Sequence, residues 1–139
     1  MASTYEQISI AARPEDVWDA VRDVGALHTR LVPGFVVDTR LEGQTRVVTF
    51  GNGMVVREPI LSIDDGRRRL AWLAIGGRLE HYSASLQVFA EGSGSRVLWI
   101  ADFLPDDFEA TVRGLLVQGL AAMKQTLEHA AQASLGVNT

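Results

Sequence analysis

The last third of the chain limits the possible folds most, because it is typical of a single long helix. No proline follows Pro105, and Asp106 and Glu109 are placed to cap the first turn. At about 100° per residue, one broad arc collects the residues Phe108, Val112, Leu115, Leu116, Gly119, Leu120, Met123 and Leu127. A helix from Pro105 to about Ala133 would be ~40 Å long at ~1.5 Å per residue. Something wide must therefore cover its apolar face.

The preceding residues predict that cover. Tyr5–Ile10 alternates with period two, as a strand does, and Pro14 opens a short helix with apolar residues at helical spacing. A second helical turn is expected near Ala26–Arg30. Hairpin signals such as Asp64-Asp65-Gly66 then separate six further strands. These strands are expected at residues 35–41, 45–50, 54–63, 67–75, 79–90 and 96–104.

This order of elements predicts an α+β fold. An antiparallel sheet with one apolar face needs a cover, and the long helix is the one element large enough to provide it. We expect a single domain over residues 1–139, with a curved seven-stranded antiparallel sheet wrapped around the C-terminal helix. Two short helices follow the first strand. The length of 139 residues is sufficient for one substantial core.

Composition excludes several functions. A net charge of -4 disfavours nucleic acid as a partner, and the absence of cysteine excludes disulfides and thiolate chemistry. No apolar run approaches the roughly 20 residues that a membrane span needs, and no leader is apparent. A cytoplasmic protein is expected. The histidines lack metal-ligand spacing, and no nucleophile or nucleotide-binding motif occurs, so neither a metal nor a cofactor is predicted.

The inner face of the sheet can be read from strand periodicity. It is expected to carry Leu70, Trp72, Ala74, Tyr82, Ala84, Leu86, Val88, Val97, Trp99, Ala101 and Phe103. Bulky residues separated by alanines either interlock into a filled core or leave a void, and the sequence leaves both possibilities open. Leu98 and Ile100 on the outer face would allow a homodimer as well as a monomer.

Glu58 gives a sharper indication of a pocket. It lies mid-strand next to Arg57, so one of the two must face inward. A lone buried carboxylate is costly unless water or a polar partner reaches it, so an inward Glu58 would indicate a hydrated pocket. The alternative is that Glu58 faces solvent.

Three segments resemble a known superfamily. Residues 12–21 look like its first helix, and residues 78–82 and 95–99 are similar to its last two strands. The chain thus resembles the START-like, or SRPBCC, helix-grip superfamily in its polyketide cyclase/dehydrase and lipid-transport branch. The resemblance covers nearly the whole chain and implies the helix-grip fold. That fold hosts carriers, receptors and cyclases, so it does not decide the chemistry.

Within that branch, residues 57–82 look close to the plant abscisic-acid receptors. This similarity implies that a cavity is lined by Glu58, Trp72, Tyr82 and Ala84 from the sheet and by Phe108, Val112 and Leu116 from the helix. To these we add Val37, Val48, Phe50, Trp99, Leu115 and Gly119, with Gly119 leaving room in the pocket wall. Residues 50–54 and 75–78 correspond to the loops that guard the receptors' pocket.

Departures from the receptors change the expected ligand. Val37 lies near the position of the lysine that anchors a ligand carboxylate in the receptors, and Leu116 replaces their helix asparagine. A small, mainly hydrophobic ligand is therefore expected, such as a polyketide-, isoprenoid- or lipid-like molecule. The alternative is a polyketide cyclase or dehydratase in which Glu58 and Tyr82 transfer protons. A third possibility is an interaction or stress-response module whose cavity is incidental.

Overall fold

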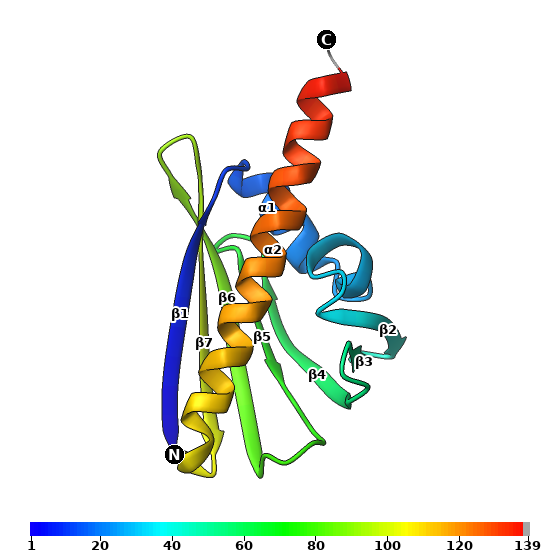
Figure 1. Cartoon of the computed structure of the whole chain (residues 1–139), viewed down its shortest axis with the longest axis vertical. Helices are drawn as coiled ribbons and strands as arrows, with labels where there is room; N and C mark the ends of the chain where they lie inside the picture. Colours follow the sequence, from blue (N-terminus) through cyan, green and yellow to red (C-terminus); the bar gives the residue numbers. More distant parts are fainter. Residues whose placement is uncertain (138–139) are drawn as a thin grey trace.

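The computed structural model describes residues 1–137 and contains the predicted elements in the predicted order (Figure 1). The strands are β1 (Ala2–Ile10), β2 (Val36–Glu42), β3 (Thr45–Phe50), β4 (Val55–Asp64), β5 (Arg69–Leu73), β6 (His81–Glu91) and β7 (Gly94–Leu104). The helical elements are α1 (Pro14–Arg22), the π-helical turn η1 (Leu27–Leu31), the 3-10 turn η2 (Asp106–Phe108) and α2 (Glu109–Val137).

The seven strands form one antiparallel sheet in the order β1-β7-β6-β5-β4-β3-β2. Consecutive strands from β2 to β7 are neighbours, and β1 pairs with β7 at one edge, so the predicted meander is confirmed. Residues 55–59 of β4 pair with β3 and residues 60–64 pair with β5, while Arg57 also forms an isolated bridge to Ile75 after β5. The β4–β5 pairing has a register shift between Ile60 and Ser62. Such a bulge bends its strand and adds to the curvature of the sheet.

Helix α2 crosses the concave side of the sheet and extends past its end (Figure 1). Its buried residues repeat at helical spacing and are Val112, Leu116, Leu120, Met123 and Leu127. The predicted cap is not present, because α2 begins after η2 and no side chain bonds the free amides of that turn. The carboxylate of Asp106 instead lies 3.6 Å from the amino group of Met1.

The short helix α1 is tied to the β4–β5 hairpin by two hydrogen bonds. Val17 and Val21 are buried in the core, while the Trp18 indole Nε1 donates to Asp65 at 2.9 Å. Arg22 Nε donates to the same carboxylate at 2.8 Å. The β4–β5 turn, which contains Asp65, therefore fixes the position of α1, and Val21 of α1 lines the cavity described below.

The predicted face assignment of the central strands is confirmed. Val97, Ala101 and Phe103 on β7 are fully buried, and Leu70 and Trp72 on β5 are nearly so. Ile100 faces the other side, where it pairs with the exposed Tyr5 of β1. The inward side chains of the central strands therefore lie between the sheet and α2.

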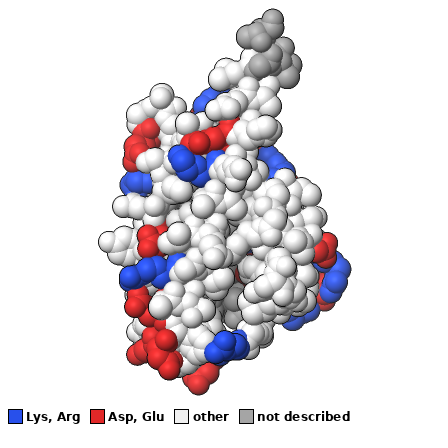
Figure 2. Space-filling model, in the orientation of Figure 1, with Lys and Arg blue, Asp and Glu red and all other residues white. Residues whose placement is uncertain are grey.

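The surface over the middle of α2 carries no charged side chains in the view of Figure 2. Lys, Arg, Asp and Glu gather instead toward the β1 side and beside the β2–β3 hairpin. The exposed residues of this part of the helix are neutral: Gly114, Val117, Gln118 and Ala121. Substitutions here can serve as controls, because they lie on the opposite side of α2 from its buried face.

Candidate functional site

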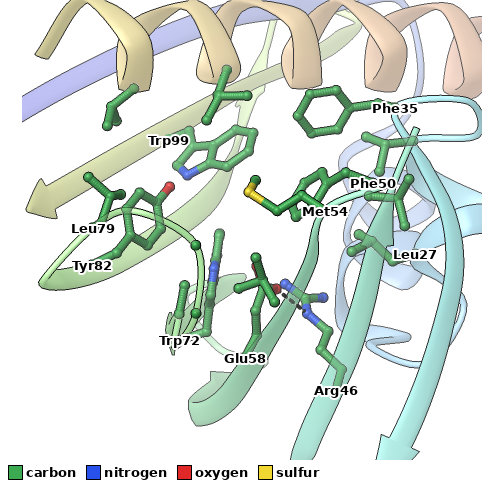
Figure 3. A pocket seen from close by; sticks show the side chains of 18 of the residues that line it. Leu27, Phe35, Arg46, Phe50, Met54, Glu58, Trp72, Leu79, Tyr82 and Trp99 are labelled. Carbon is green, nitrogen blue, oxygen red and sulfur yellow. Dashed lines mark hydrogen bonds and ion pairs between the residues drawn. The ribbon is translucent and has the colours of Figure 1, made fainter. Parts of the chain in front are cut away.

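A cavity of about 360 Å³ lies between the sheet and the first half of α2 (Figure 3). Most of its wall is apolar, with side chains from the helical turns, the sheet and α2, including Leu31, Phe35, Val56, Leu70, Leu79 and Val112. Interiors normally pack densely with few voids larger than a water molecule. Of the two possibilities that the sequence left open, the structure has the void.

The mouth of the cavity lies between two loops and the start of α2. Asn52 comes from the β3–β4 loop, Gly76 and Gly77 come from the β5–β6 loop, and Thr111 comes from α2. All four are exposed. Arg78 lies over the Phe108 ring at 5.0 Å, a cation–π distance, which links the second loop to η2. The two loops lie within residues 50–54 and 75–78, which the resemblance to the receptors predicts as the guarding loops.

Glu58 faces inward and has a charged partner. Arg46 stands directly opposite it on β3, and Arg46 Nε donates to Glu58 Oε1 at 2.7 Å. The two residues are only 3% and 7% exposed, and both line the cavity. The Arg46 guanidinium also lies 5.3 Å from the centre of the Trp72 ring. The cavity therefore has one buried ionic position in a largely apolar wall.

Tyr82 on β6 points into the cavity beside Trp99 of β7 (Figure 3). Burial raises the pKa of the Tyr82 hydroxyl well above its usual range, and the nearby negative charge of Glu58 raises it further. The Trp99 indole beside the hydroxyl offsets part of this effect. Tyr82 is therefore a neutral phenol at physiological pH.

The raised pKa of Tyr82 predicts a loss of stability in alkali. Above about pH 10 the tyrosine ionises in the unfolded chain but not in the folded protein, so unfolding releases a proton and stability falls as pH rises. We expect this one group to contribute a slope of up to about 1.4 kcal/mol per pH unit. Urea unfolding of wild type and Tyr82→Phe between pH 8 and 11.5 measures it. Parallel curves for the two proteins would contradict the prediction.

Eight of the residues proposed from sequence come together at the cavity wall. They are Phe50, Glu58, Trp72, Tyr82, Trp99, Phe108, Val112 and Leu115. Three others, Val48, Ala84 and Leu116, are buried but do not line the cavity, so their positions belong to the surrounding core.

Val37 and Gly119 require correction. The register of β2 shifts between Val36 and Asp38, so Val36 is buried at the cavity wall while Val37 is 53% exposed. Gly119 does not leave room for a ligand. A Cβ atom there would lie 2.6 Å from the Trp99 ring, so the glycine makes space for this tryptophan against α2.

Arg46, Phe35, Met54 and Leu79 also line the cavity and were not predicted. A signal for Arg46 was present, because it shares strand parity with Val48 and Phe50, which had been placed inward. Phe35 and Met54 lie just outside strands, where periodicity gives no direction. The partner of Glu58 could therefore have been found, but the loop residues could not.

No group of three potential metal ligands occurs within residues 1–137. In the same part of the chain, no helix is both long enough and apolar enough to cross a bilayer.

Comparison with known proteins gives a family match and several structural matches. A family model described as polyketide cyclase / dehydrase and lipid transport matches residues 1–128. A search of curated proteins found no match. Among solved structures, the XoxI protein of Bacillus cereus superposes with a TM-score of 0.80 at 24% identity, covering 91% of this chain and 96% of the other.

Two further solved structures share the fold at lower identity. A START superfamily protein of Mycobacterium smegmatis has a TM-score of 0.73 at 12% identity, covering 94% of this chain and 97% of its own. Norcoclaurine synthase of Thalictrum flavum has a TM-score of 0.70 at 19% identity, with coverages of 93% and 85%. At these identities the likeness concerns the helix-grip fold alone.

Proposed function

The chain belongs to the polyketide cyclase / dehydrase and lipid transport family, and from this premise we propose that it binds a small, mainly hydrophobic molecule between the sheet and α2. The observation that carries the proposal is the cavity of about 360 Å³ with its largely apolar wall. Pockets that enclose small molecules have volumes of roughly 300–1,000 Å³ and are mostly apolar with a few placed polar groups. The cavity fits both parts of this description.

Packing energetics support the same reading. Large-to-small core substitutions cost stability in proportion to the cavity that they leave, at about 24 cal/mol per Å³. A natural cavity of this size is therefore a substantial loss of packing. A ligand offsets that loss, because burying its apolar surface contributes roughly 25 cal/mol per Å². Polyketide-, isoprenoid- and lipid-like molecules supply such surface.

The cyclase or dehydratase alternative would use Glu58 and Tyr82 for proton transfer. No specific observation favours it. Tyr82 retains its proton at physiological pH, and Oε1 of Glu58 is already engaged by Arg46 at 2.7 Å. Both groups can instead orient a ligand that remains unchanged, and binding is the function that we propose.

Filling the cavity provides the test. Leu115 lines the cavity, so Leu115→Trp places a much larger side chain at the cavity wall. We expect this variant to bind the neutral fluorescent probe N-phenyl-1-naphthylamine at least fivefold more weakly than wild type. Fluorescence titration measures the affinity, and circular dichroism confirms that the variant folds.

Val117→Trp is the matched control, because Val117 is two residues away on α2 but 50% exposed. We expect its affinity for the probe to remain within twofold of wild type. Equal affinities for the two variants, or no binding of the probe to wild type, would contradict the proposal. Native mass spectrometry of freshly purified protein can then identify a molecule carried from the cell.

A further inference from the structure

The Arg46 side chain has more hydrogen-bond donors than the structure pairs. A guanidinium carries five N–H donors in a rigid planar fork. Its Nε bonds Glu58, but its Nη1 is buried and has no hydrogen-bond partner within residues 1–137. The whole residue is only 3% exposed. The free end of the fork points toward the middle of the cavity (Figure 3).

Trp72 adds a second unpaired donor in the same place. Its indole Nε1 is also buried without a partner, and the residue is 3% exposed. The two side chains are in contact, since the Arg46 guanidinium lies over the Trp72 ring at 5.3 Å. Both line the cavity. We call this part of the wall the Arg46–Trp72 corner.

The Arg46–Trp72 corner offers hydrogen-bond donors and no acceptors from these two side chains. Arginine and tryptophan donate hydrogen bonds and cannot accept them. A buried donor without a partner costs free energy that is recovered when an acceptor arrives, and this cost makes such a site selective. A purely hydrocarbon ligand would leave both donors unpaired. A ligand with an oxygen acceptor at this end would pair at least one of them.

Charge decides between a neutral and an anionic acceptor. Glu58 already pairs with Arg46, so the pair is close to neutral as a unit. A ligand carboxylate would place a second negative charge beside Glu58 in apolar surroundings, where an uncompensated charge is expensive. A carbonyl oxygen accepts hydrogen bonds without adding charge.

We infer that the ligand carries a neutral carbonyl oxygen, as in a ketone, quinone or ester, and that this oxygen binds at the Arg46–Trp72 corner. This inference rests on the proposed function and narrows its ligand class. The hydrophobic body of the molecule fills the apolar part of the cavity. The carbonyl fixes its orientation.

A pair of probes isolates the carbonyl. Fluorene and fluorenone share one tricyclic frame and differ at one carbon, which bears the carbonyl oxygen in fluorenone. We expect wild-type protein to bind fluorenone five- to tenfold more tightly than fluorene. Trp72→Phe keeps an aromatic ring but removes the N–H group. In this variant the preference for fluorenone, measured as the ratio of the two affinities in the same protein, should fall to threefold or less.

The three tryptophans provide a direct readout in a ¹H–¹⁵N spectrum of the labelled full chain. We expect the Trp72 indole N–H signal to lie further downfield in the fluorenone complex than in the fluorene complex. The fluorene complex controls for ring-current shifts, because the two probes share the same aromatic frame. Trp18 is the internal reference, because its Nε1 is bonded to Asp65. Its signal should not distinguish the two probes. The Trp72→Phe variant assigns the Trp72 signal.

Each outcome decides a different claim. If both probes bind with equal affinity and leave the Trp72 signal in the same position, the carbonyl inference is overturned and the proposed function stands. If fluorene binds more tightly than fluorenone, the corner does not recognise an acceptor. If neither probe binds, the proposed function fails, and the inference fails with it.

Discussion

Replacing Arg46 by methionine is expected to lower the free energy of unfolding by about 3–5 kcal/mol, because it leaves Glu58 charged and buried without its partner. Methionine has a flexible chain that occupies much of the arginine stem's space, so loss of charge dominates the effect. Arg46 and Glu58 are 3% and 7% exposed, and their charged atoms are 2.7 Å apart. Urea unfolding followed by circular dichroism measures the change.

A double variant distinguishes the loss of the whole Arg46–Glu58 ion pair from the cost of leaving one buried charge unpaired. Replacing a buried ion pair by apolar residues of similar volume is often neutral or stabilising, so Arg46→Met combined with Glu58→Met should recover most of the loss. The matched control is Arg57→Met, because Arg57 adjoins Glu58 on β4 but faces solvent and pairs with Glu42 at 3.3 Å. This control should unfold close to wild type. If Arg46→Met were no more destabilising than Arg57→Met, Glu58 would be hydrated in the folded protein.

The sheet and its buried face could be predicted because they depend on local signals. Hairpin residues such as Asp64-Asp65-Gly66 fix where strands end, and period-two alternation fixes which residues share a face. Leu70, Val97 and Phe103 are buried as that alternation required. The long α2 followed from the absence of proline and the apolar arc.

The errors arise where local periodicity is interrupted or where two distant segments meet. Val37 was placed in the pocket because it lies near the position of the receptors' lysine, but it sits at the register shift of β2 and faces solvent. The position of Arg46 opposite Glu58 depends on the register between β3 and β4, which one strand alone does not reveal. Gly119 was placed on the correct side of α2, but the group that requires its small size comes from β7.

The cavity itself could be anticipated only as one of two possibilities. The mixture of large and small inward residues is compatible with a filled core, and the outcome depends on how Trp72 and Trp99 pack together. Their ring centres are 5.9 Å apart, and Trp99 lies against α2 at Gly119. The two rings meet at a tilt of 54°, and this contact keeps both tryptophans together in the cavity wall. Tryptophan packing thus preserves the void that a ligand can fill.

That packing predicts opposite effects for alanine at the two glycines inside α2. Gly114→Ala should raise the free energy of unfolding by about 0.5–1 kcal/mol, because alanine favours a helix and its Cβ would meet nothing within 4 Å. Gly119→Ala has the same helical benefit, but its Cβ would lie 2.6 Å from Trp99. Overpacking costs about 1–3 kcal/mol, so we expect Gly119→Ala to be about 2 kcal/mol less stable than Gly114→Ala.

The same contact links stability to binding. Trp99 is held against α2 on one side and lines the cavity on the other, so the added methyl group should push its ring into the cavity. We expect Gly119→Ala to bind N-phenyl-1-naphthylamine more than tenfold more weakly, with Gly114→Ala unchanged. Urea unfolding and probe titration of both variants test the two effects together. If Gly114→Ala and Gly119→Ala had equal stability and equal affinity for the probe, Trp99 would be able to move away from α2 without entering the cavity. That result would contradict the role of Trp99 in shaping the cavity.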